Sequence, residues 1–246
     1  MARIFRDNLE MIQEINRELK INGITIPVKH YQNIQLSGED QLTKELIGVN
    51  FIINKPWLNK REMLEFIFPD EIDKMEKYCI QEFEDRINRS GLNPGNSYKI
   101  RLDLWQSLMS KDVINKFDYT YSERINYKKQ LDNVISTLKE DINSRQAMIM
   151  IFRPDDMEKT GGNTRIPCSI SYQFLIRNNR LHIIYYIRSN DYFKHFAIDI
   201  YLTNSMQMYI VEQLKPYYNN LQCGTLNYYA GSLHAYNEDL KRWEIF

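Results

Sequence analysis

The stretch Pro167-Cys168-Ser169-Ile170-Ser171-Tyr172-Gln173-Phe174 and the residues after it decide how this chain folds. Residues 169–176 and 181–187 are rich in β-branched and aromatic side chains and flank Asn178-Asn179, a pair typical of a two-residue hairpin turn. The second run leads straight into Arg188-Ser189-Asn190-Asp191. A thiol, a guanidinium and a carboxylate therefore lie one hairpin apart, and we expect them to begin an active site.

Hydrophobic patterning around this hairpin predicts one α+β domain, a mixed β-sheet packed with helices, over residues 1–246. Apolar residues at helical spacing predict helices over residues 4–20, 71–89, 126–141 and 192–214. Dense apolar runs predict further strands over residues 46–53, 147–152 and 226–230. Breaker residues mark residues 92–97 as a loop, and Gly161-Gly162 mark residues 155–165 as a mobile one.

The composition favours a small-molecule substrate. Lys+Arg and Asp+Glu both total 32, so no net charge draws the chain to nucleic acid or to an anionic membrane. No window approaches the ~18 uninterrupted apolar residues of a membrane span, and the N-terminus lacks a signal-peptide pattern, so we expect a cytoplasmic protein. Three cysteines and four histidines at these spacings predict neither a disulfide framework nor a metal site.

Cys168 is the candidate nucleophile. A cysteine attacks an electron-poor carbon as the thiolate, and a nearby guanidinium such as that of Arg188 favours this form. Taken alone, Cys168 would more often be an inert buried thiol, because free cysteine is among the most buried residue types. Cys79 and Cys223 keep that interpretation, whereas the surroundings of Cys168 favour a reactive role.

Four segments, in order, resemble the thymidylate synthase and deoxycytidylate hydroxymethylase family. They are Leu131-Asp132 through Asn143-Ser144-Arg145, Pro167-Cys168 with Gln173-Phe174, Arg188-Ser189-Asn190-Asp191, and His234-Ala235-Tyr236. Each dipeptide alone would mean little, but four ordered matches over nearly half of the chain are specific. The resemblance implies a thymidylate synthase-like fold in which one face of the sheet forms the interface of a homodimer.

The resemblance implies covalent chemistry on a pyrimidine nucleotide. Cys168 would add to ring carbon 6, which makes carbon 5 a nucleophile towards the one-carbon unit of 5,10-methylenetetrahydrofolate. Glu82 would be the general acid and base, although a glutamate on a helix is often only solvated. Asp191 would hold the pyrimidine and assist proton transfer.

The same resemblance implies the binding residues. Arg188 and Ser189 would bind the 5'-phosphate, and Arg145 would reach the phosphate of the neighbouring subunit of the homodimer. His234 and Tyr236 would hydrogen-bond the 3'-hydroxyl group of the sugar. The remaining residues implied are Gln173 on the nucleophile strand, as a substrate-binding residue, and Trp105 and Tyr119 beside the folate, where both could equally be core aromatics.

Asp199 interrupts the apolar run of residues 196–201, where an acid needs a partner or a function. The matching position is asparagine in the uracil-using branch of the family and aspartate in the hydroxymethylase branch. A carboxylate accepts a hydrogen bond from the exocyclic amine of cytosine. Uracil has a carbonyl oxygen at that position, so two acceptors would face each other and repel. Because such a mismatch in a buried site costs ~1–3 kcal/mol, we expect Asp199 to select cytosine. The alternative interpretation is a helix-surface acid.

The likeness to the hydroxymethylase branch implies that water attacks the exocyclic methylene. The substrates dCMP or CMP, methylenetetrahydrofolate and water would then give the 5-hydroxymethyl nucleotide and tetrahydrofolate. A CMP-specific hydroxymethylase of an antimetabolite pathway stays open, because His234 and Tyr236 leave the 2' position unread. Methylation of dUMP, as by thymidylate synthase, also stays open. A DNA cytosine methyltransferase is disfavoured, because no Gly-x-Gly loop for S-adenosylmethionine occurs among the nine glycines.

The chain also departs from the family pattern. Ser169 stands where thymidylate synthases usually have histidine, and Gln146 where a second phosphate arginine is common. The sequence ends at Trp243-Glu244-Ile245-Phe246, where many relatives continue into a segment that closes over folate. A non-catalytic nucleotide-binding homodimer is therefore a further alternative, and an assay for release of tritium from carbon 5 distinguishes it from an enzyme.

Overall fold

The computed structural model describes residues 2–32, 34–160 and 164–240. Its centre is a seven-stranded mixed sheet in which β1-β5-β9-β8-β7-β6 are neighbours in that order and β2 pairs with β5. The seven strands are β1 (Arg3–Phe5), β2 (Ile24–Pro27), β5 (Leu42–Ile53), β6 (Met148–Met150), β7 (Ser169–Arg177), β8 (Arg180–Asp191) and β9 (Gln222–Tyr236). A separate two-stranded ribbon is formed by β3 (His30–Tyr31) and β4 (Ile34–Gln35).

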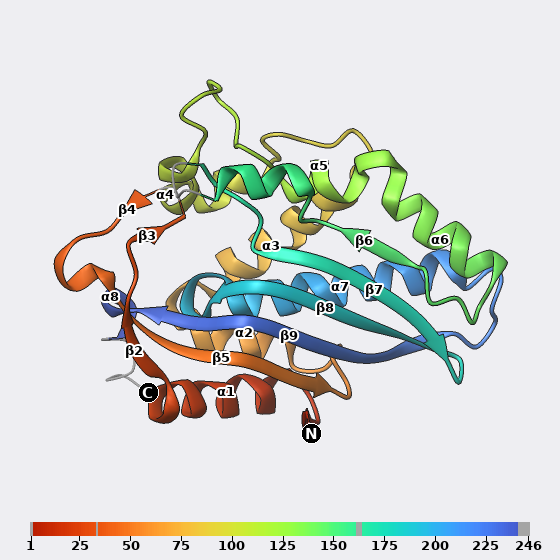
Figure 1. Ribbon diagram of the computed structural model, residues 1–246. Helices are drawn as coiled ribbons and strands as arrows, with labels where there is room; N and C mark the ends of the chain where they lie inside the picture. Colours follow the sequence, from red (N-terminus) through yellow and green to blue (C-terminus); the bar gives the residue numbers. More distant parts are fainter. Residues whose placement is uncertain (1, 33, 161–163, 241–246) are drawn as a thin grey trace.

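The α-helices of the described residues are α1 (Asn8–Asn22), α2 (Lys60–Ile67), α3 (Ile72–Ile87), α4 (Leu102–Trp105), α5 (Tyr121–Asn126), α6 (Gln130–Glu140), α7 (Ala197–Leu214) and α8 (Asn237–Leu240). In Figure 1, α2, α3 and α7 lie behind the strands. The near face of β5, β9, β8 and β7 carries no helix in the part of the chain that the structure describes (Figure 1). The predicted α+β architecture, a mixed sheet packed with helices, is confirmed.

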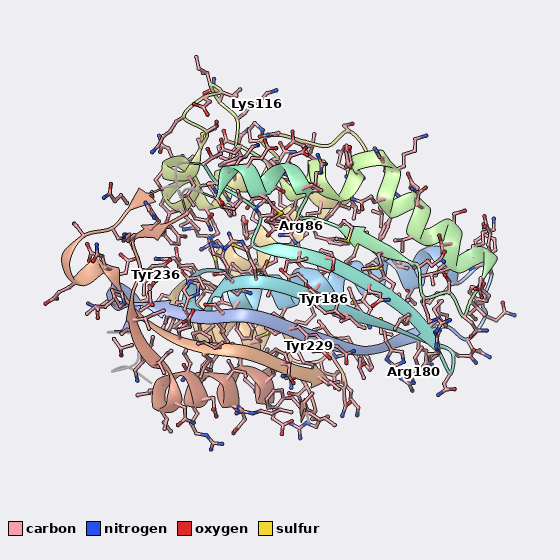
Figure 2. The ribbon with its side chains drawn as sticks, viewed as in Figure 1. Arg86, Lys116, Arg180, Tyr186, Tyr229 and Tyr236 are labelled. Atoms are coloured by element: carbon pink, nitrogen blue, oxygen red, sulfur yellow. The ribbon has the colours of Figure 1, made fainter. Side chains whose placement is uncertain are left out.

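The open face of the sheet carries a stacked tyrosine pair. Tyr186 of β8 and Tyr229 of β9 are partners in the parallel register, and their ring centroids lie 5.3 Å apart. Figure 2 shows both side chains on the face turned towards the viewer. Met148 and Met150 on the edge strand β6 are also exposed. An exposed apolar face of this kind is typical of a surface that binds another protein.

The predicted hairpin around Asn178-Asn179 is present. Strands β7 and β8 are antiparallel and pair from Ser169 opposite Ile187 to Arg177 opposite Arg180. Asn178 and Asn179 join them with φ values of 50° and 56°. Two consecutive positive φ angles suit the right-handed twist of the strands, and asparagine tolerates this conformation better than most residues.

Helix α7 connects two parallel strands, β8 and β9, and is buried over most of its circumference. The predicted helix over residues 192–214 is correct from Ala197, but its first turn, Tyr192–Phe196, is a π-helix. The predicted strand over residues 226–230 is longer than expected, because β9 runs from Gln222 to Tyr236. Gly231 permits this, since a Cβ there would lie 2.7 Å from the Arg188 carbonyl oxygen.

Two predicted helix starts were wrong, and local chemistry explains both. Ile4 belongs to strand β1, and α1 begins at Asn8 because the Asp7 side chain caps it by accepting from the amides of Leu9 and Glu10. The helix predicted over residues 126–141 begins at Gln130, because Lys128 and Lys129 adopt left-handed conformations. In the predicted mobile loop, residues 154–159 form a 3-10 helix, and Gly161-Gly162 lie outside the described residues.

Candidate active site

A cavity of about 300 Å³ opens where β8 and β9 end. Most of the residues that the sequence argument selected line it, namely Glu82, Trp105, Tyr119, Cys168, Arg188, Ser189, Asp191, Asp199, His234 and Tyr236. Because β8 and β9 are parallel, their carboxyl ends meet, with Ser189 opposite Ser232 and Asp191 opposite His234. Crevices at the carboxyl ends of parallel strands are common ligand sites.

Cys168 lies at the start of β7, directly beside β8. The Arg188 amide donates to the Cys168 carbonyl at 2.8 Å, which fixes the two residues side by side. The Arg188 Nη2 atom lies 3.7 Å from the Cys168 Sγ atom, and Gln32 Nε2 approaches the same sulfur at 3.8 Å. Arg188 Nε donates to the Pro167 carbonyl at 3.0 Å, which orients the guanidinium. The thiol is half-buried and faces the cavity with a cation beside it.

Helix α3 supplies one side of the cavity. Tyr78, Glu82 and Arg86 recur every four residues, so they share one helix face, and all three line the cavity. Glu82 accepts from Arg86 Nε at 2.8 Å and from Ser97 Oγ at 2.6 Å. The Glu82 carboxylate is thus held by two donors while it lines the cavity.

Asp199 is buried in the first turns of α7, with 9% of its surface exposed. Its Oδ1 atom lies 4.0 Å from Arg86 Nη2. Burial raises the pKa of Asp199 to about 6, the charge of Glu82 acts in the same direction, and the charge of Arg86 and a hydrogen bond from Asn190 act against the rise. Asp199 is therefore a buried carboxylate whose charge depends on its neighbours, and a helix-surface acid does not describe it.

One carboxylate oxygen of Asp191 caps the π-helix Tyr192–Phe196, and the residue lines the cavity. Its Oδ1 accepts from the amides of Phe193 at 3.1 Å and Lys194 at 3.0 Å. Its Oδ2 is buried and has no hydrogen-bond partner among the described residues. Burial raises the pKa of Asp191, although the Lys194 charge opposes this rise. A buried, unpartnered carboxylate oxygen at a cavity wall is expected to meet a ligand donor.

His234 and Tyr236 lie two residues apart at the end of β9, so both side chains are on the same face of the strand. The His234 and Tyr236 rings are perpendicular, with centroids 5.3 Å apart. His234 Nδ1 lies 3.1 Å from Ser232 Oγ, and Ser232 in turn donates to Glu45. Burial lowers the pKa of His234 to about 4, so the imidazole is neutral at pH 7. A neutral imidazole can exchange a hydrogen bond with a hydroxyl group without carrying charge.

The far side of the cavity is aromatic. Trp105 Nε1 is buried and has no hydrogen-bond partner within the described ranges, and the Trp105 ring lies 5.7 Å from that of His195. Tyr119 donates to the Ile166 carbonyl at 3.4 Å, and burial raises the pKa of Tyr119 to about 12. Arg165 packs against both rings, at 5.3 Å from Trp105 and 5.2 Å from Tyr119. This wall suits a flat heterocycle that can accept a hydrogen bond.

Arg145 and Gln173 do not line this cavity. Gln173 Nε2 donates to the Arg145 carbonyl at 3.1 Å, and the Arg145 side chain is exposed. A role for Arg145 across a dimer needs a second chain, so it stays a prediction, and so does substrate binding by Gln173. Other residues that line the cavity were not predicted from the sequence. They include Gln32, Arg86, Arg165 and His195. Of these, Arg86 had a signal, its four-residue spacing from Glu82.

Fold and site together define a class: an α+β protein in which strand ends gather a thiol, a guanidinium and buried carboxylates around one cavity. The sequence model of the thymidylate synthase family matches residues 36–245. The chain therefore belongs to the thymidylate synthase family, as the ordered motifs predicted.

Individual relatives refine the comparison. The chain is 24% identical over 206 residues to the deoxycytidylate 5-hydroxymethyltransferase of Enterobacteria phage T4, a match that covers 79% of this chain and 76% of that protein. It is 28% identical over 144 residues to a Methanosarcina mazei protein named "Putative thymidylate synthase", covering 57% of this chain and only 61% of that protein. Thermostable thymidylate synthase A from Bacillus subtilis shares the fold, with a TM-score of 0.64 at 15% identity over 97% of this chain and 83% of that chain.

No helix within residues 2–32, 34–160 and 164–240 has the length and apolar character needed to cross a membrane. The same residues contain no group of three or more His, Cys, Asp or Glu side chains placed to hold a metal ion.

Proposed function

We propose that this protein is a hydroxymethyltransferase that converts dCMP or CMP, 5,10-methylenetetrahydrofolate and water to the 5-hydroxymethyl nucleotide and tetrahydrofolate. The observation that carries the proposal is the presence of a buried carboxylate, Asp199, in the same cavity as Cys168. The match of 206 residues to a phage deoxycytidylate 5-hydroxymethyltransferase, longer than the match of 144 residues to the Methanosarcina mazei protein, supports the same choice.

Cys168 would start the reaction. Its thiolate forms a bond to ring carbon 6, and the electron pair of the 5,6 double bond moves to carbon 5. Arg188, 3.7 Å from the sulfur, stabilises the thiolate before attack. Glu82, held by Arg86 and Ser97, would move protons at the base, including the one that carbon 5 loses. Carbon 5 would bond to the one-carbon unit and lose its proton as tetrahydrofolate leaves. Water would then add to the resulting exocyclic methylene as the bond between carbon 6 and Cys168 breaks, which restores the 5,6 double bond.

The cavity residues fit methylenetetrahydrofolate. Trp105 Nε1 is a buried donor that lacks a partner among the described residues, and a pterin ring offers acceptors. Asp191 Oδ2, buried and likewise without a partner there, would hold the pyrimidine and assist proton transfer. Trp105 and Tyr119 would hold this co-substrate by stacking and edge contacts. When bound, it supplies a one-carbon unit at the oxidation level of formaldehyde.

Asp199 would read the base. An ionised carboxylate accepts from the exocyclic amine of cytosine, whereas a uracil carbonyl would leave two acceptors facing each other. With a pKa of about 6, Asp199 is mostly ionised at pH 7.5, the state that favours cytosine. The mismatch with uracil costs ~1–3 kcal/mol, a preference of roughly 5- to 150-fold.

The phosphate site would be completed by a second copy of the chain. Arg188 and Ser189 line one side of the cavity, and Arg145 is exposed outside it. The helix-free sheet face, with Tyr186 and Tyr229 stacked on it, is the surface on which two copies would pack (Figure 2). A homodimer through this face would let Arg145 of each copy reach the other copy's phosphate.

A competition experiment tests the proposal. The protein is incubated with dCMP, CMP, dUMP and UMP together with methylenetetrahydrofolate, and products are identified by mass spectrometry. We expect a 5-hydroxymethyl product from dCMP or CMP. Methylated dUMP as the main product would favour the second candidate, thymidylate synthesis, which the family match and the Bacillus subtilis fold support. Absence of any product would favour a nucleotide-binding protein without turnover.

A further inference from the structure

We infer that Arg86 is a positioning residue that sets the base preference of the cavity, because its guanidinium lies between Glu82 and Asp199. This inference rests on the proposed function. Arg86 Nε donates to Glu82 Oε1 at 2.8 Å, and Arg86 Nη2 lies 4.0 Å from Asp199 Oδ1. Arg86 is only 5% exposed, and its guanidinium sits 4.2 Å above the Tyr121 ring. One buried cation therefore serves two carboxylates that have different tasks.

The Arg86 guanidinium lies closer to the Glu82 carboxylate than to that of Asp199. Arg86 makes a full hydrogen bond with Glu82, so the guanidinium is anchored on its own helix, four residues along. At 4.0 Å it stabilises the Asp199 charge without a close hydrogen bond. The Asp199 oxygens thus stay available to a base, which a bidentate pair would not allow. Burial alone would lower the pKa of Arg86, but the charges of Glu82 and Asp199 raise it, so the guanidinium stays charged.

The protonation state of Asp199 decides what it can bind. Ionised, it accepts from the cytosine amine and opposes the uracil carbonyl. Protonated, its O–H group can donate to the uracil carbonyl or to the ring nitrogen of cytosine, so the protonated form discriminates less between the two bases. A residue that shifts this equilibrium therefore shifts the base preference. The groups that act on Asp199 come from every element around it: Glu82 and Arg86 on α3, Arg101 in the 3-10 helix Ser97–Arg101, Tyr121 on α5, Tyr172 on β7, Tyr185 and Asn190 on β8, and Tyr228 on β9.

Glu82 and Arg86 act on this equilibrium with opposite signs. Burial is the largest cause that raises the pKa of Asp199, and Glu82 adds to it, whereas Arg86 lowers it. Loss of the Arg86 charge should keep Asp199 protonated to higher pH, and loss of the Glu82 charge should ionise it at lower pH. If Arg86 and Glu82 were merely structural, their separate removal would not shift the pKa of Asp199, and with it the base preference, in opposite directions.

Binding measurements on the full chain test this inference without turnover. The dissociation constants of dCMP and dUMP are measured by calorimetry from pH 5 to 8.5, and their ratio is plotted against pH. In the unmodified protein the preference for dCMP should grow as pH rises through about 6. In Arg86→Met the rise should move to higher pH, and for each pH unit that it moves, the ratio of ionised to protonated Asp199 at a given pH falls tenfold. In Glu82→Gln the rise should move to lower pH.

Arg124→Met is the matched control. Arg124 is another buried arginine on a nearby helix, but it pairs with Asp156 and does not line the cavity, so its loss should leave the ratio curve in place. Curves for Arg86→Met and Glu82→Gln that superimpose on that of the unmodified protein would overturn the inference alone. Failure of the unmodified protein to bind either nucleotide would overturn the proposed function with it. If Arg86→Met does not fold, the isosteric Glu82→Gln decides the matter by the direction of its shift.

Discussion

Two buried arginines of this chain hold carboxylates in opposite ways. Arg124 is paired with Asp156 through two hydrogen bonds, at 2.9 Å and 2.7 Å, and neither residue lines the cavity. Arg86 makes one hydrogen bond to Glu82 and stands 4.0 Å from Asp199, and all three line the cavity. The Arg124–Asp156 pair is thus satisfied within the folded chain.

The Arg86 region is completed only by a ligand. In the same cavity Asp191 Oδ2 and Trp105 Nε1 are buried without partners among the described residues. Unsatisfied buried groups cost stability, and folded proteins keep them mainly where a function needs them. The comparison teaches that the bidentate Arg124–Asp156 pair serves the scaffold, whereas Arg86, shared between Glu82 and Asp199, belongs to the site.

The largest effect expected is that of Cys168→Ser, which removes chemistry from the cavity and leaves both arginine regions intact. A serine hydroxyl at this place is a far weaker nucleophile, so turnover should fall by at least ~10³-fold, while nucleotide binding stays within about threefold. Turnover is measured by product formation, and binding by calorimetry. Cys223→Ser is the matched control, since Cys223 lies outside the cavity and should be dispensable. Substantial turnover by Cys168→Ser would remove the thiol from its role.

Breaking the complete pair should damage stability instead. Asp156→Ala leaves the Arg124 charge buried without its bidentate partner, which should lower the free energy of unfolding by ~3–5 kcal/mol. Chemical denaturation measures this loss. Nucleotide affinity of the protein that remains folded should change little, because neither residue lines the cavity. A variant as stable as the parent would show that the pair is not a structural anchor.

The smallest effect expected is that of Asp199→Asn, which should raise the free energy of unfolding where Asp156→Ala lowers it. The folded-state pKa of Asp199 is about 6, above the ordinary 3.8, so folding favours the protonated form, and stability falls as pH rises from about 4 to 6. At pH 8 the full cost, about 3 kcal/mol at most, is present. Asp199→Asn should therefore stabilise the protein by ~1–3 kcal/mol at pH 8 and by little at pH 4. Unfolding curves at the two pH values check this. Equal effects at both would mean that Asp199 carries no charge penalty.

Much of the strand half of the site could be predicted from the sequence. The Asn178-Asn179 turn fixes the hairpin register from Arg177 to Ser171. A shift of one residue between Ser171 and Ser169 then sets Cys168 beside Arg188, and parallel pairing of β8 and β9 brings Asp191 to His234. The hairpin follows from a local pattern and the site residues from the ordered motifs, whereas the register shift and the parallel pairing are tertiary features that the sequence did not predict.

The helix half could be predicted only in part. Glu82 was found through the family motif, but the role of Arg86 depends on how α3 packs against α7, which no local pattern encodes. Gln32 was missed for the same reason, since it reaches the site through a tertiary contact with Cys168. Asn190 stands in the quoted motif, but its interaction with Asp199 depends on the packing of β8 against α7. The predicted start of α1 was wrong for another reason, because the apolar spacing continues on the N-terminal side of the Asp7 cap.

Release of tritium from carbon 5 tests most directly whether this cavity activates a cytidylate through Cys168. The protein is mixed with methylenetetrahydrofolate and with dCMP, CMP or dUMP labelled at carbon 5, and tritium in water is counted. We expect release from dCMP or CMP, faster than from dUMP by roughly 5- to 150-fold, and none with Cys168→Ser. Release from dUMP alone, or from no nucleotide, would contradict this account.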